Sequence, residues 1–355
     1  MKILVLGGTG AMGRYLVNLL AEQGNQVVVT SRTRTGRNGN IEFITGNAQD
    51  ELFLMGLLGQ QWDAIVDFMA YSTPIFKSRY KHFLNASGHY IYLSSSRVYA
   101  DSEVPLTESS PRLLDVTEDK AYLETDEYAL SKARQENILF SSPQKNWSIV
   151  RPYITYSDER LQLGVLEKED WLYRALQGKA IVTSSDIQSK YTTLTFGADV
   201  AKGIASLIGR VDAHSEAFHI TSNISISWSE VLKIYTRVLD SNLHCNPPEL
   251  LQNMDDFMGW RAGKYQITYD RLYDRKFDNS KINNFVDTST FISPKIGLSD
   301  CLKKFINSDS PNFKALDWKA EAKRDRLLGE YTSLTGMKGL KQKAKYCIYR
   351  HLSFL

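Results

Sequence analysis

Tyr128 and Lys132 have the residue types and the spacing of an acid/base pair. Residues four apart share one face of a helix, so the phenol and the ammonium can point into the same cleft. A free tyrosine has a pKa of about 10 and is a poor base at neutral pH. A close ammonium stabilises the phenolate and lowers this pKa. Because the spacing also arises by chance in exposed helices, the catalytic interpretation depends on what surrounds the pair.

A hydroxyl group is the expected third member of this set. The apolar stretch Tyr90–Ser94 predicts a buried strand, and it runs into three consecutive serines, Ser94, Ser95 and Ser96. Ligands of open α/β sheets bind at the carboxyl ends of the strands, where these hydroxyls are expected. The spacing alone leaves all three serines as candidates.

The segment Gly7–Gly13 has the pattern of a dinucleotide-binding turn. Its glycines form G-x-x-G-x-x-G directly after the apolar run Ile3–Leu6 and at the start of an amphipathic helix. Glycines permit a tight turn and let the backbone approach a pyrophosphate, which binds at the helix N-terminus. This context favours a dinucleotide over a glycine-rich turn without a ligand. The predicted cofactor contacts in this turn are Gly7, Thr9, Gly10, Ala11, Met12 and Gly13.

The end of the second predicted strand, Gln26–Thr30, favours NADP(H) over NAD(H). An acidic residue here would hold the ribose hydroxyls of NAD, but residues 23–41 contain no Asp or Glu. Ser31 and Arg32 place a hydroxyl beside a guanidinium, which suits a 2′-phosphate. The alternative for Ser31 and Arg32 is a solvated basic loop that binds no cofactor. The alternative for Asn47 is a residue that only forms a turn. The remaining predicted cofactor contacts follow later strands: Asn47, Ala48, Met69, Ala70, Pro152 and Tyr153.

Alternating strands and helices must position these residues. Short continuous apolar runs predict strands buried on both faces of a parallel sheet, joined by helices. The predicted strands of this sheet are Ile3–Leu6, Gln26–Thr30, Ile41–Thr45, Asp63–Phe68, Tyr90–Ser94 and Ser148–Arg151. After Pro152 longer, mixed elements follow. We therefore expect an α/β fold, a Rossmann-type doubly wound parallel sheet with a smaller, interleaved C-terminal α/β substrate domain.

Three parts of the chain are expected. Residues 1–155 form the dinucleotide-binding domain, residues 156–307 form the substrate domain, and residues 308–355 form a basic helical extension. At 355 residues, the chain is long enough for two modest domains.

The composition excludes several classes of function. The 43 Lys and Arg against 40 Asp and Glu give a net charge of +3, too balanced to indicate nucleic-acid binding by the chain as a whole. The three cysteines are far apart, which argues against a disulfide framework and fits a reducing cytoplasm. The six histidines lack the spacing of metal ligands, so no metal is expected. No apolar stretch reaches the roughly 18 residues that a membrane span needs.

Four motifs taken together resemble a known family. Gly7–Gly13, Ser94–Tyr99, Tyr128–Lys132 and Arg151-Pro152 are similar to the motifs of the extended short-chain dehydrogenase/reductases, the NAD-dependent epimerase/dehydratase family. Most members act on the sugar of a nucleotide-activated hexose by hydride exchange with a bound nicotinamide. The resemblance therefore implies a nucleotide-sugar substrate.

The resemblance also implies roles for individual residues. It implies that Tyr128 is the acid/base, that Lys132 binds the nicotinamide ribose and tunes Tyr128, and that Ser95 hydrogen-bonds the reacting oxygen. The family's dehydratases have an acidic pair where this chain has Ser96 and Arg97, so a 4,6-dehydratase is disfavoured. The predicted substrate contacts are Ser96, Arg97 and Arg261, the last resembling a phosphate-binding arginine of the family.

Two enzymatic functions and one non-enzymatic function remain. An exchangeable NADPH favours a keto-sugar reductase, whereas a C4-type epimerase with tightly bound NAD(P) is the alternative. A dinucleotide-sensing binding module is disfavoured because Ser95, Tyr128 and Lys132 are all present.

The balanced net charge conceals a basic tail. From Lys314 onward, ten Lys and Arg against four Asp and Glu give +6, which leaves −3 for residues 1–313. Apolar residues at i, i+4 spacing predict an amphipathic helix in this tail. We expect its apolar stripe to dock on the protein body, with a second subunit of a homodimer or an anionic membrane surface as alternatives. The stripe consists of Leu340, Ala344, Ile348 and Leu352.

Overall fold

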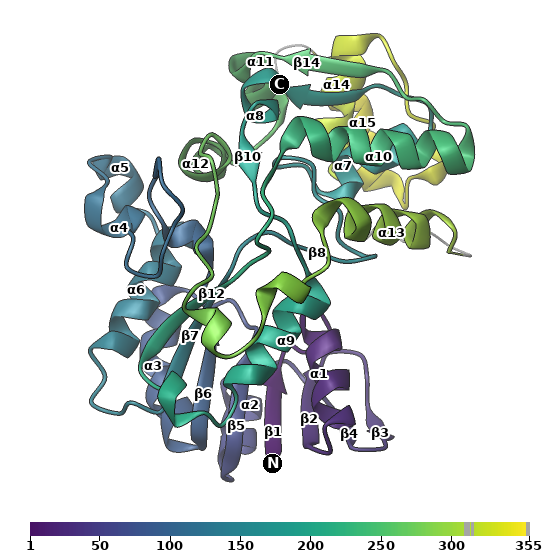
Figure 1. The fold of residues 1–355 in the computed structure, drawn as a ribbon. Helices are drawn as coiled ribbons and strands as arrows, with labels where there is room; N and C mark the ends of the chain where they lie inside the picture. The colour runs from purple at the N-terminus through teal and green to yellow at the C-terminus, as the bar shows by residue number, and fades with distance from the viewer. Residues whose placement is uncertain (309–312, 314–315, 353–355) are drawn as a thin grey trace. The chain divides into compact units, whose positions relative to one another are not determined.

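The chain forms two compact units, each assembled from segments that are distant in the sequence. The structure is a computed structural model that describes residues 1–308, 313 and 316–352. The first unit comprises Met1–Ser157, Thr193–Ser225 and Arg275–Pro294, and the second comprises Asp158–Thr192, Ile226–Asp274 and Lys295–Leu355 (Figure 1). The domain boundaries expected at residues 155 and 307 stay a prediction, because compactness does not show which segments fold independently.

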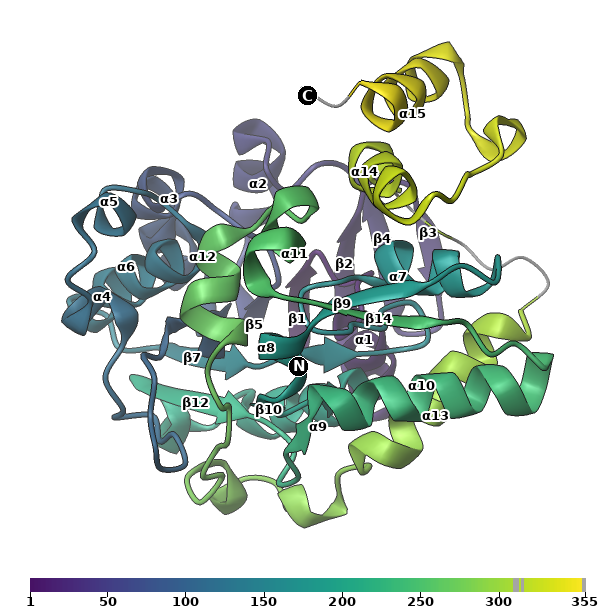
Figure 2. The same cartoon turned by 90° about the horizontal axis from the view of Figure 1, so that it is seen from above.

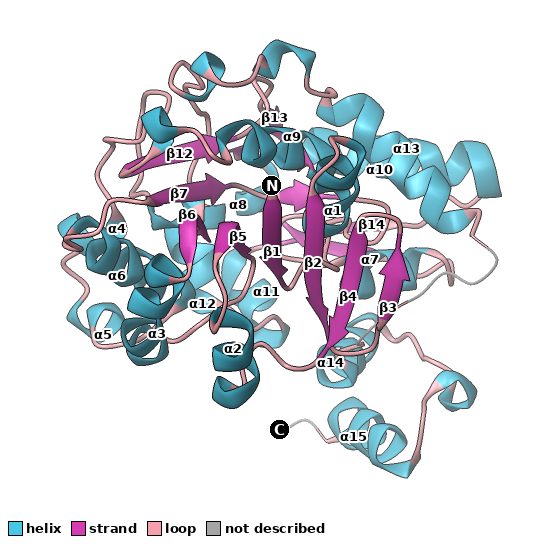
Figure 3. Cartoon of the chain, turned by 90° about the horizontal axis from the view of Figure 1, so that it is seen from below, coloured by secondary structure: helices cyan, strands magenta, loops and turns pink. Residues whose placement is uncertain are grey.

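An eight-stranded sheet is the centre of the first unit (Figure 3). Its strand order is β12-β7-β6-β5-β1-β2-β4-β3, and every neighbouring pair is parallel except β3 with β4. The strands are β1 (Lys2–Leu6), β2 (Gln26–Ser31), β3 (Gly36–Asn38), β4 (Ile41–Thr45), β5 (Trp62–Asp67), β6 (Ser87–Leu93), β7 (Trp147–Pro152) and β12 (Glu216–Ile220).

Helices cover both faces of this sheet because its strands are apolar on both faces. In β1, Ile3 and Val5 pack into one core and Leu4 and Leu6 pack into the other. The first core includes residues of α1 (Gly13–Glu22) and α9 (Gly197–Leu207). The second includes residues of α2 (Glu51–Leu58), α3 (Thr73–Asn85) and α6 (Tyr128–Phe140). The predicted Rossmann-type doubly wound fold is therefore confirmed.

The strand order places a switch point beside β1. The chain passes from β1 to β2 and β4 on one side and then returns to β5 on the other side. In such sheets the loops at the carboxyl ends of the strands part at the switch point and leave a crevice for a ligand. The shorter elements of this unit are the 3-10 helix Ser96–Val98, α4 (Leu113–Val116), α5 (Lys120–Leu123), β8 (Thr155–Tyr156), β11 (Thr195–Phe196) and three further 3-10 turns, Val211–Ala213, Ile282–Asn284 and Thr288–Thr290.

The second unit combines helices with two small sheets. β9 pairs in parallel with β14, and β10 pairs antiparallel with β13. The side chains of Trp171 and Tyr235 stack with ring centroids 4.4 Å apart. Its elements are α7 (Lys168–Ala175), β9 (Ile181–Ser184), α8 (Ser185–Gln188), β10 (Tyr191–Thr192), β13 (Ile226–Ser227), α10 (Trp228–Leu243), β14 (Glu249–Gln252), α11 (Met254–Trp260), α12 (Lys264–Gln266), the π-helical turn Ile267–Arg271, α13 (Pro294–Ile306), α14 (Trp318–Leu328), the 3-10 turn Leu334–Gly336 and α15 (Leu340–His351).

The C-terminal helix does not dock as the sequence predicts. α15 lies against α14 (Figure 2), and the fully buried residue in this contact is Tyr346, which packs with Trp318 and Met337. The tyrosine hydroxyl also donates to Asp325 at 2.7 Å. The predicted stripe of Leu340, Ala344, Ile348 and Leu352 is instead exposed to solvent. The expectation that this stripe is buried against the body is wrong, because an aromatic residue on the opposite side of the helix makes the contact.

Candidate active site

A cleft opens at the switch point of the first unit. It has a volume of about 410 Å³ and is bounded by the segments that follow β1, β2, β4 and β5. Its lining residues are Gly7, Thr9, Gly10, Thr30, Ser31, Arg32, Gly46, Asn47, Ala48, Gln49, Phe68, Met69 and Ala70. None of these residues is acidic.

The glycines of the first turn have three different reasons to be glycine. Gly7 has φ +72°, and a Cβ there would lie 3.0 Å from the Met69 sulfur. A Cβ on Gly13 would lie 2.7 Å from the Gly8 backbone, so Gly13 permits close packing at the start of α1. At Gly10 a Cβ would meet no atom within 4 Å and would project into open space. The turn therefore leaves a cradle free of side chains at a helix N-terminus, which fits a pyrophosphate.

The polar end of the cleft is formed by Ser31 and Arg32. The Ser31 hydroxyl oxygen accepts the backbone N–H groups of Thr33 at 3.3 Å and Arg34 at 3.0 Å. Its own proton has no acceptor among the described residues and can be donated to a ligand, and Arg32 beside it is exposed. A hydroxyl donor and a guanidinium, with no carboxylate in the lining, form a donor set that suits a phosphate.

Nine of the predicted cofactor contacts line this cleft, and seven do not, two of which are Tyr128 and Lys132 on α6. Ala11, Met12, Gly13, Pro152 and Tyr153 are absent from the lining. Met12 is the N-cap residue of α1, and Tyr153 packs against Phe277 with ring centroids 5.4 Å apart. Four lining residues escaped prediction: Thr30, Gly46, Gln49 and Phe68. Each is adjacent to a predicted contact, so extending the prediction to whole turns would have found them.

Tyr128 and Lys132 lie at the start of α6 but differ strongly in exposure. Tyr128 is the first residue of the helix and is 42% exposed, whereas Lys132 is buried. The Lys132 ammonium lies 5.9 Å from the centroid of the Tyr128 ring and donates a hydrogen bond of 2.6 Å to the backbone oxygen of Leu93. The structure therefore brings the predicted pair together, with the tyrosine partly exposed and the ammonium buried.

Burial changes the protonation of Lys132. Removal from water lowers the pKa of its ammonium to about 8, although the negative charges of Asp67 and Glu136 partly oppose this shift. Lys132 therefore stays mostly charged at neutral pH. Burial likewise raises the pKa of Asp67 to about 6, against the hydrogen bonds that it accepts from the Met69 backbone N–H and the Tyr90 hydroxyl.

Within the described part of the chain, two of the three consecutive serines donate their hydroxyl proton to a protein acceptor, and one does not. Ser94 donates to Glu136 at 2.6 Å, and Ser96 donates to the backbone oxygen of Arg151 at 2.8 Å. The Ser95 oxygen accepts the Arg97 backbone N–H at 3.2 Å, which leaves its proton available. This geometry selects Ser95 as the candidate hydroxyl. The predicted contact of Ser96 with substrate is not supported, because its side chain is fully buried and committed to the core.

Arg97 contacts the candidate acid/base directly. Its guanidinium carbon lies 5.3 Å from the centroid of the Tyr128 ring. An ion pair of 2.7 Å with Glu127, the N-cap residue of α6, holds the guanidinium in place. Tyr128 thus has two cations near its ring, one buried and one partly exposed.

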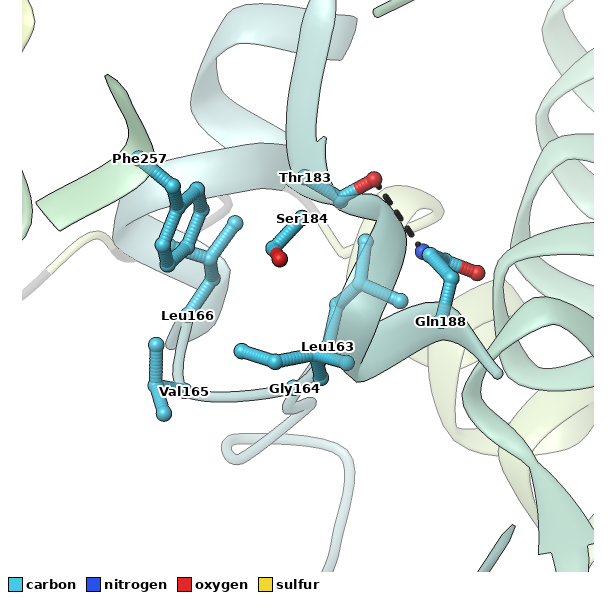
Figure 4. Close-up of a pocket in the computed structure, with 9 residues that line it drawn as sticks. Leu163, Gly164, Val165, Leu166, Thr183, Ser184, Gln188 and Phe257 are labelled. Carbon is cyan, nitrogen blue, oxygen red and sulfur yellow. Dashed lines mark hydrogen bonds between the residues drawn. The ribbon is translucent and has the colours of Figure 1, made fainter. Parts of the chain in front are cut away.

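Arg261, the third predicted substrate contact, belongs to the second unit and bonds Val165, which lines a small pocket there. It donates to the backbone oxygen of Val165 at 2.7 Å, and its other terminal nitrogen lies 3.6 Å from Asp170. Figure 4 shows the pocket, in which Val165 and Phe257 face the Thr183–Gln188 hydrogen bond. Its volume of about 10 Å³ has room for a single water molecule. Arg261 is therefore partly engaged by the protein itself, and its contact with substrate stays a prediction.

Two curated proteins are similar in sequence to this chain. The chloroplast stem-loop binding protein of 41 kDa b of Arabidopsis thaliana is 24% identical over 274 residues, which are 70% of this chain and 67% of that protein. The UDP-glucose 4-epimerase of Lactobacillus helveticus is 28% identical over 152 residues. That match covers 39% of this chain and less than half, 46%, of the epimerase.

Solved structures share the fold at low sequence identity. An epimerase of Methanothermobacter thermautotrophicus matches with a TM-score of 0.68 and 18% identity, covering 86% of this chain and 92% of that one. The enzyme WbmH of Bordetella bronchiseptica, in complex with NAD+, matches with a TM-score of 0.64 and 18% identity, covering 87% and 99%.

A family model decides the classification. The model of the NAD dependent epimerase/dehydratase family matches residues 3–221, which include the glycine turn, the three serines, Tyr128 and Lys132. This range is more than half of the chain. The protein therefore belongs to the NAD dependent epimerase/dehydratase family.

Proposed function

We propose that this protein is an NADP(H)-dependent reductase of a keto group on the hexose of a nucleotide-activated sugar. The observation that carries the proposal is the phenol of Tyr128, a residue that is 42% exposed and whose ring has the cations of Lys132 and Arg97 within 6 Å of its centroid. Such a phenol is poised to transfer a proton at a substrate oxygen. The cleft at the same sheet edge fits the dinucleotide that supplies the hydride when it is bound.

Three side chains divide the work at the reacting oxygen. Tyr128 donates its proton to the carbonyl oxygen as that oxygen gains negative charge, so the product is an alcohol and the phenol becomes a phenolate. Lys132 stabilises the phenolate electrostatically. Ser95 donates a hydrogen bond to the same substrate oxygen, which holds it near the phenol and stabilises developing charge.

The choice of NADP(H) depends on Ser31 and Arg32. Both line the cleft, and no carboxylate is available there to hold ribose hydroxyls. An NADP(H) preference suits a reductase, because a reductase consumes reduced cofactor at each turnover. The Bordetella bronchiseptica enzyme was solved with NAD+, and this describes the cofactor of that enzyme. The choice of cofactor for the present protein depends on its own cleft residues.

Cofactor consumption tests this proposal. Purified protein is incubated with NADPH and a panel of nucleotide 4-keto-sugars, and the loss of reduced cofactor is followed. We expect oxidation of NADPH by the wild type and none by Tyr128→Phe. The absence of oxidation together with NAD(H) tightly held in the preparation would contradict the reductase.

A C4 epimerase is the second candidate, favoured by the similarity to the Lactobacillus helveticus UDP-glucose 4-epimerase. The same Tyr128 would then remove a proton from the sugar hydroxyl and later return it. Conversion of UDP-glucose to UDP-galactose without added cofactor would establish this activity.

A binding module without turnover is the third candidate, favoured by the name of the Arabidopsis thaliana relative. Binding of a stem-loop RNA that depends on NADP(H) and survives Tyr128→Phe, with no turnover of any nucleotide sugar, would establish it.

A further inference from the structure

The C-terminal helix α15 has one face fixed to the second unit. Tyr346 is fully buried on that face, and its hydroxyl bonds to Asp325. Arg326 of α14 donates to the backbone oxygens of Tyr349 and Leu352, which closes the end of α15 against its neighbour. The orientation of α15 on this unit is therefore set by specific contacts.

The opposite face of α15 is apolar at its centre. Leu340 is 85% exposed, Ile348 is 42% exposed, and Leu352 is 38% exposed. With about 100° per residue, Ala344 and Ile348 point away from Tyr346, and Leu340 and Leu352 lie on either side of them. Large apolar side chains in a row on one exposed helix face are the pattern of an interaction surface.

Lysines border this apolar face, and the helix that carries them contains no acidic residue. Residues 331–355 contain five Lys and Arg and no Asp or Glu. Lys341 and Lys345 are exposed at the edge of the apolar stripe. Lys345 lies 3.8 Å from Asp317, whereas the side chain of Lys341 has no acceptor among the described residues. An apolar stripe edged by cations is complementary to the acyl and anionic headgroup layers of a membrane.

We propose that the exposed face of α15 docks this protein reversibly on an anionic lipid surface. The helix would lie in the plane of the interface, with Ile348 at the acyl boundary and Lys341 and Lys345 at the headgroups. Among residues 1–308, 313 and 316–352, no helix is both long and apolar enough to cross a bilayer, so the contact is peripheral. This inference is independent of the reaction that the first unit catalyses.

Two other occupants fit the face less well. In a symmetric dimer the same patch meets itself, so the lysines of two acid-free helices would face each other and repel. A nucleic acid would be attracted by the lysines but would leave Leu340 and Ile348 without a partner, because phosphates and sugars are polar. The anionic lipid surface satisfies both the apolar stripe and the charges.

Vesicle sedimentation tests the proposal with the full chain. Protein is pelleted with vesicles of one part phosphatidylglycerol to two parts phosphatidylcholine, and with vesicles of phosphatidylcholine alone. We expect recovery with the anionic vesicles only, and we expect this recovery to fall as salt is raised.

Matched variants locate the surface. Lys341→Gln with Lys345→Gln should weaken binding to the anionic vesicles about thirtyfold. Each lysine near such a surface contributes about a five- to sixfold increase in affinity, so the loss of two multiplies to this value. Leu340→Ser with Ile348→Ser should weaken it as well without affecting the fold, because both side chains are exposed. The control is Lys233→Gln with Arg237→Gln, which removes the same charge from exposed positions of α10 and should change nothing.

Three results would overturn the proposal. The first is equal recovery with both kinds of vesicle, or recovery with neither. The second is an equal loss of binding in the α10 control, which would show that vesicle binding depends only on the net charge of the protein. The third is binding of another partner that is lost in the α15 variants while vesicle binding is kept. That partner would be a stem-loop RNA, measured by gel shift, or a second copy of the chain, measured by sedimentation equilibrium.

Discussion

Lys132 in the first unit and Lys179 in the second are both buried lysines, but their surroundings differ. Lys132 donates to a single backbone oxygen, that of Leu93, and burial lowers the pKa of its ammonium to about 8. Lys179 bonds both carboxylate oxygens of Asp325, at 3.0 and 2.9 Å, and also bonds Thr332. Among the residues that the structure describes, no carboxylate bonds the Lys132 ammonium, whereas the Lys179 ammonium is paired with Asp325.

The pairing of Lys179 is part of a larger ionic cluster. Arg174 of α7 bonds Glu321 at 2.7 Å and Asp325 at 2.9 Å, so it joins α7 to α14. Arg324 bonds Glu321 at 2.8 Å within α14. Charges that neutralise one another in the interior fix helices in place, whereas a charge such as that of Lys132 remains free to act on a neighbouring group. The comparison therefore separates two kinds of site. The paired cluster around Lys179 is architectural, because it holds α7 and α14 together, and the surroundings of Lys132 are suited to chemistry.

The largest expected effect is the loss of turnover in Tyr128→Phe. Removing the proton donor should lower the rate about 10³- to 10⁴-fold. The ring remains and only the hydroxyl is lost, so the melting temperature and the affinity for NADPH should be unchanged. Steady-state kinetics and fluorescence titration of NADPH measure the two effects. A variant with a normal rate would place the acid/base elsewhere.

The next effect is on folding, in the architectural cluster. Lys179→Met removes the ammonium from Asp325, whose side chain has no solvent exposure. Leaving a buried carboxylate with one partner fewer should lower the free energy of unfolding by about 3 kcal/mol, measured by urea titration. The rate per folded molecule should stay normal. Arg210→Gln, at an exposed pair with Asp212, is the matched control and should not change the stability measurably.

The parallel sheet could be predicted from sequence because its strands are apolar on both faces. Ile41–Thr45 was expected as a strand and is one, whereas the edge strand Gly36–Asn38 was missed because it contains no apolar residue. The short β14 (Glu249–Gln252) escaped prediction for lack of a clear alternating pattern.

The candidate site was predictable to the extent that it is local in sequence. The glycine turn and the Tyr128–Lys132 spacing were visible, but the choice among the three serines was not. That choice depends on Glu136 and on the backbone of Arg151, which only the fold brings to the serines. The paired cluster of Arg174, Lys179 and Asp325 was also invisible, because Asp325 lies 151 residues from Arg174 and 146 from Lys179 in the chain.

Lys132→Met should change stability in the opposite direction from Lys179→Met. A pKa lowered from 10.5 to about 8 means that the folded state disfavours the ammonium, so this charge destabilises the protein below pH 8. Replacing it should raise the free energy of unfolding at pH 7 by about 1–2 kcal/mol, after the lost hydrogen bond to Leu93 is subtracted.

The pH dependence sharpens this prediction. The stability advantage of Lys132→Met should shrink as the pH rises from about 8 to 10.5, where the wild-type folded state has lost its proton and the unfolded state is losing its own. Urea titrations at several pH values measure it. Turnover of the wild type should fall as the pH rises through about 8, and the variant should lack this decline. A variant less stable than the wild type at pH 7 would show that Lys132 is architectural.

The smallest expected effect concerns Arg32, a cation that is exposed and has no ion-pair partner among the described residues. Arg32→Ala removes the guanidinium from the cleft, so the KM for NADPH should rise about tenfold while kcat and the KM for NADH stay unchanged. Arg37→Ala is the matched control, because it removes the same charge from an exposed position on β3 that does not line this cleft. An equal rise in both variants would indicate a general electrostatic attraction of the cofactor. A rise for Arg32→Ala alone would show that an exposed charge can select a ligand although it contributes little to stability. The two buried lysines differ from it, because replacing either of them is expected to change the free energy of unfolding.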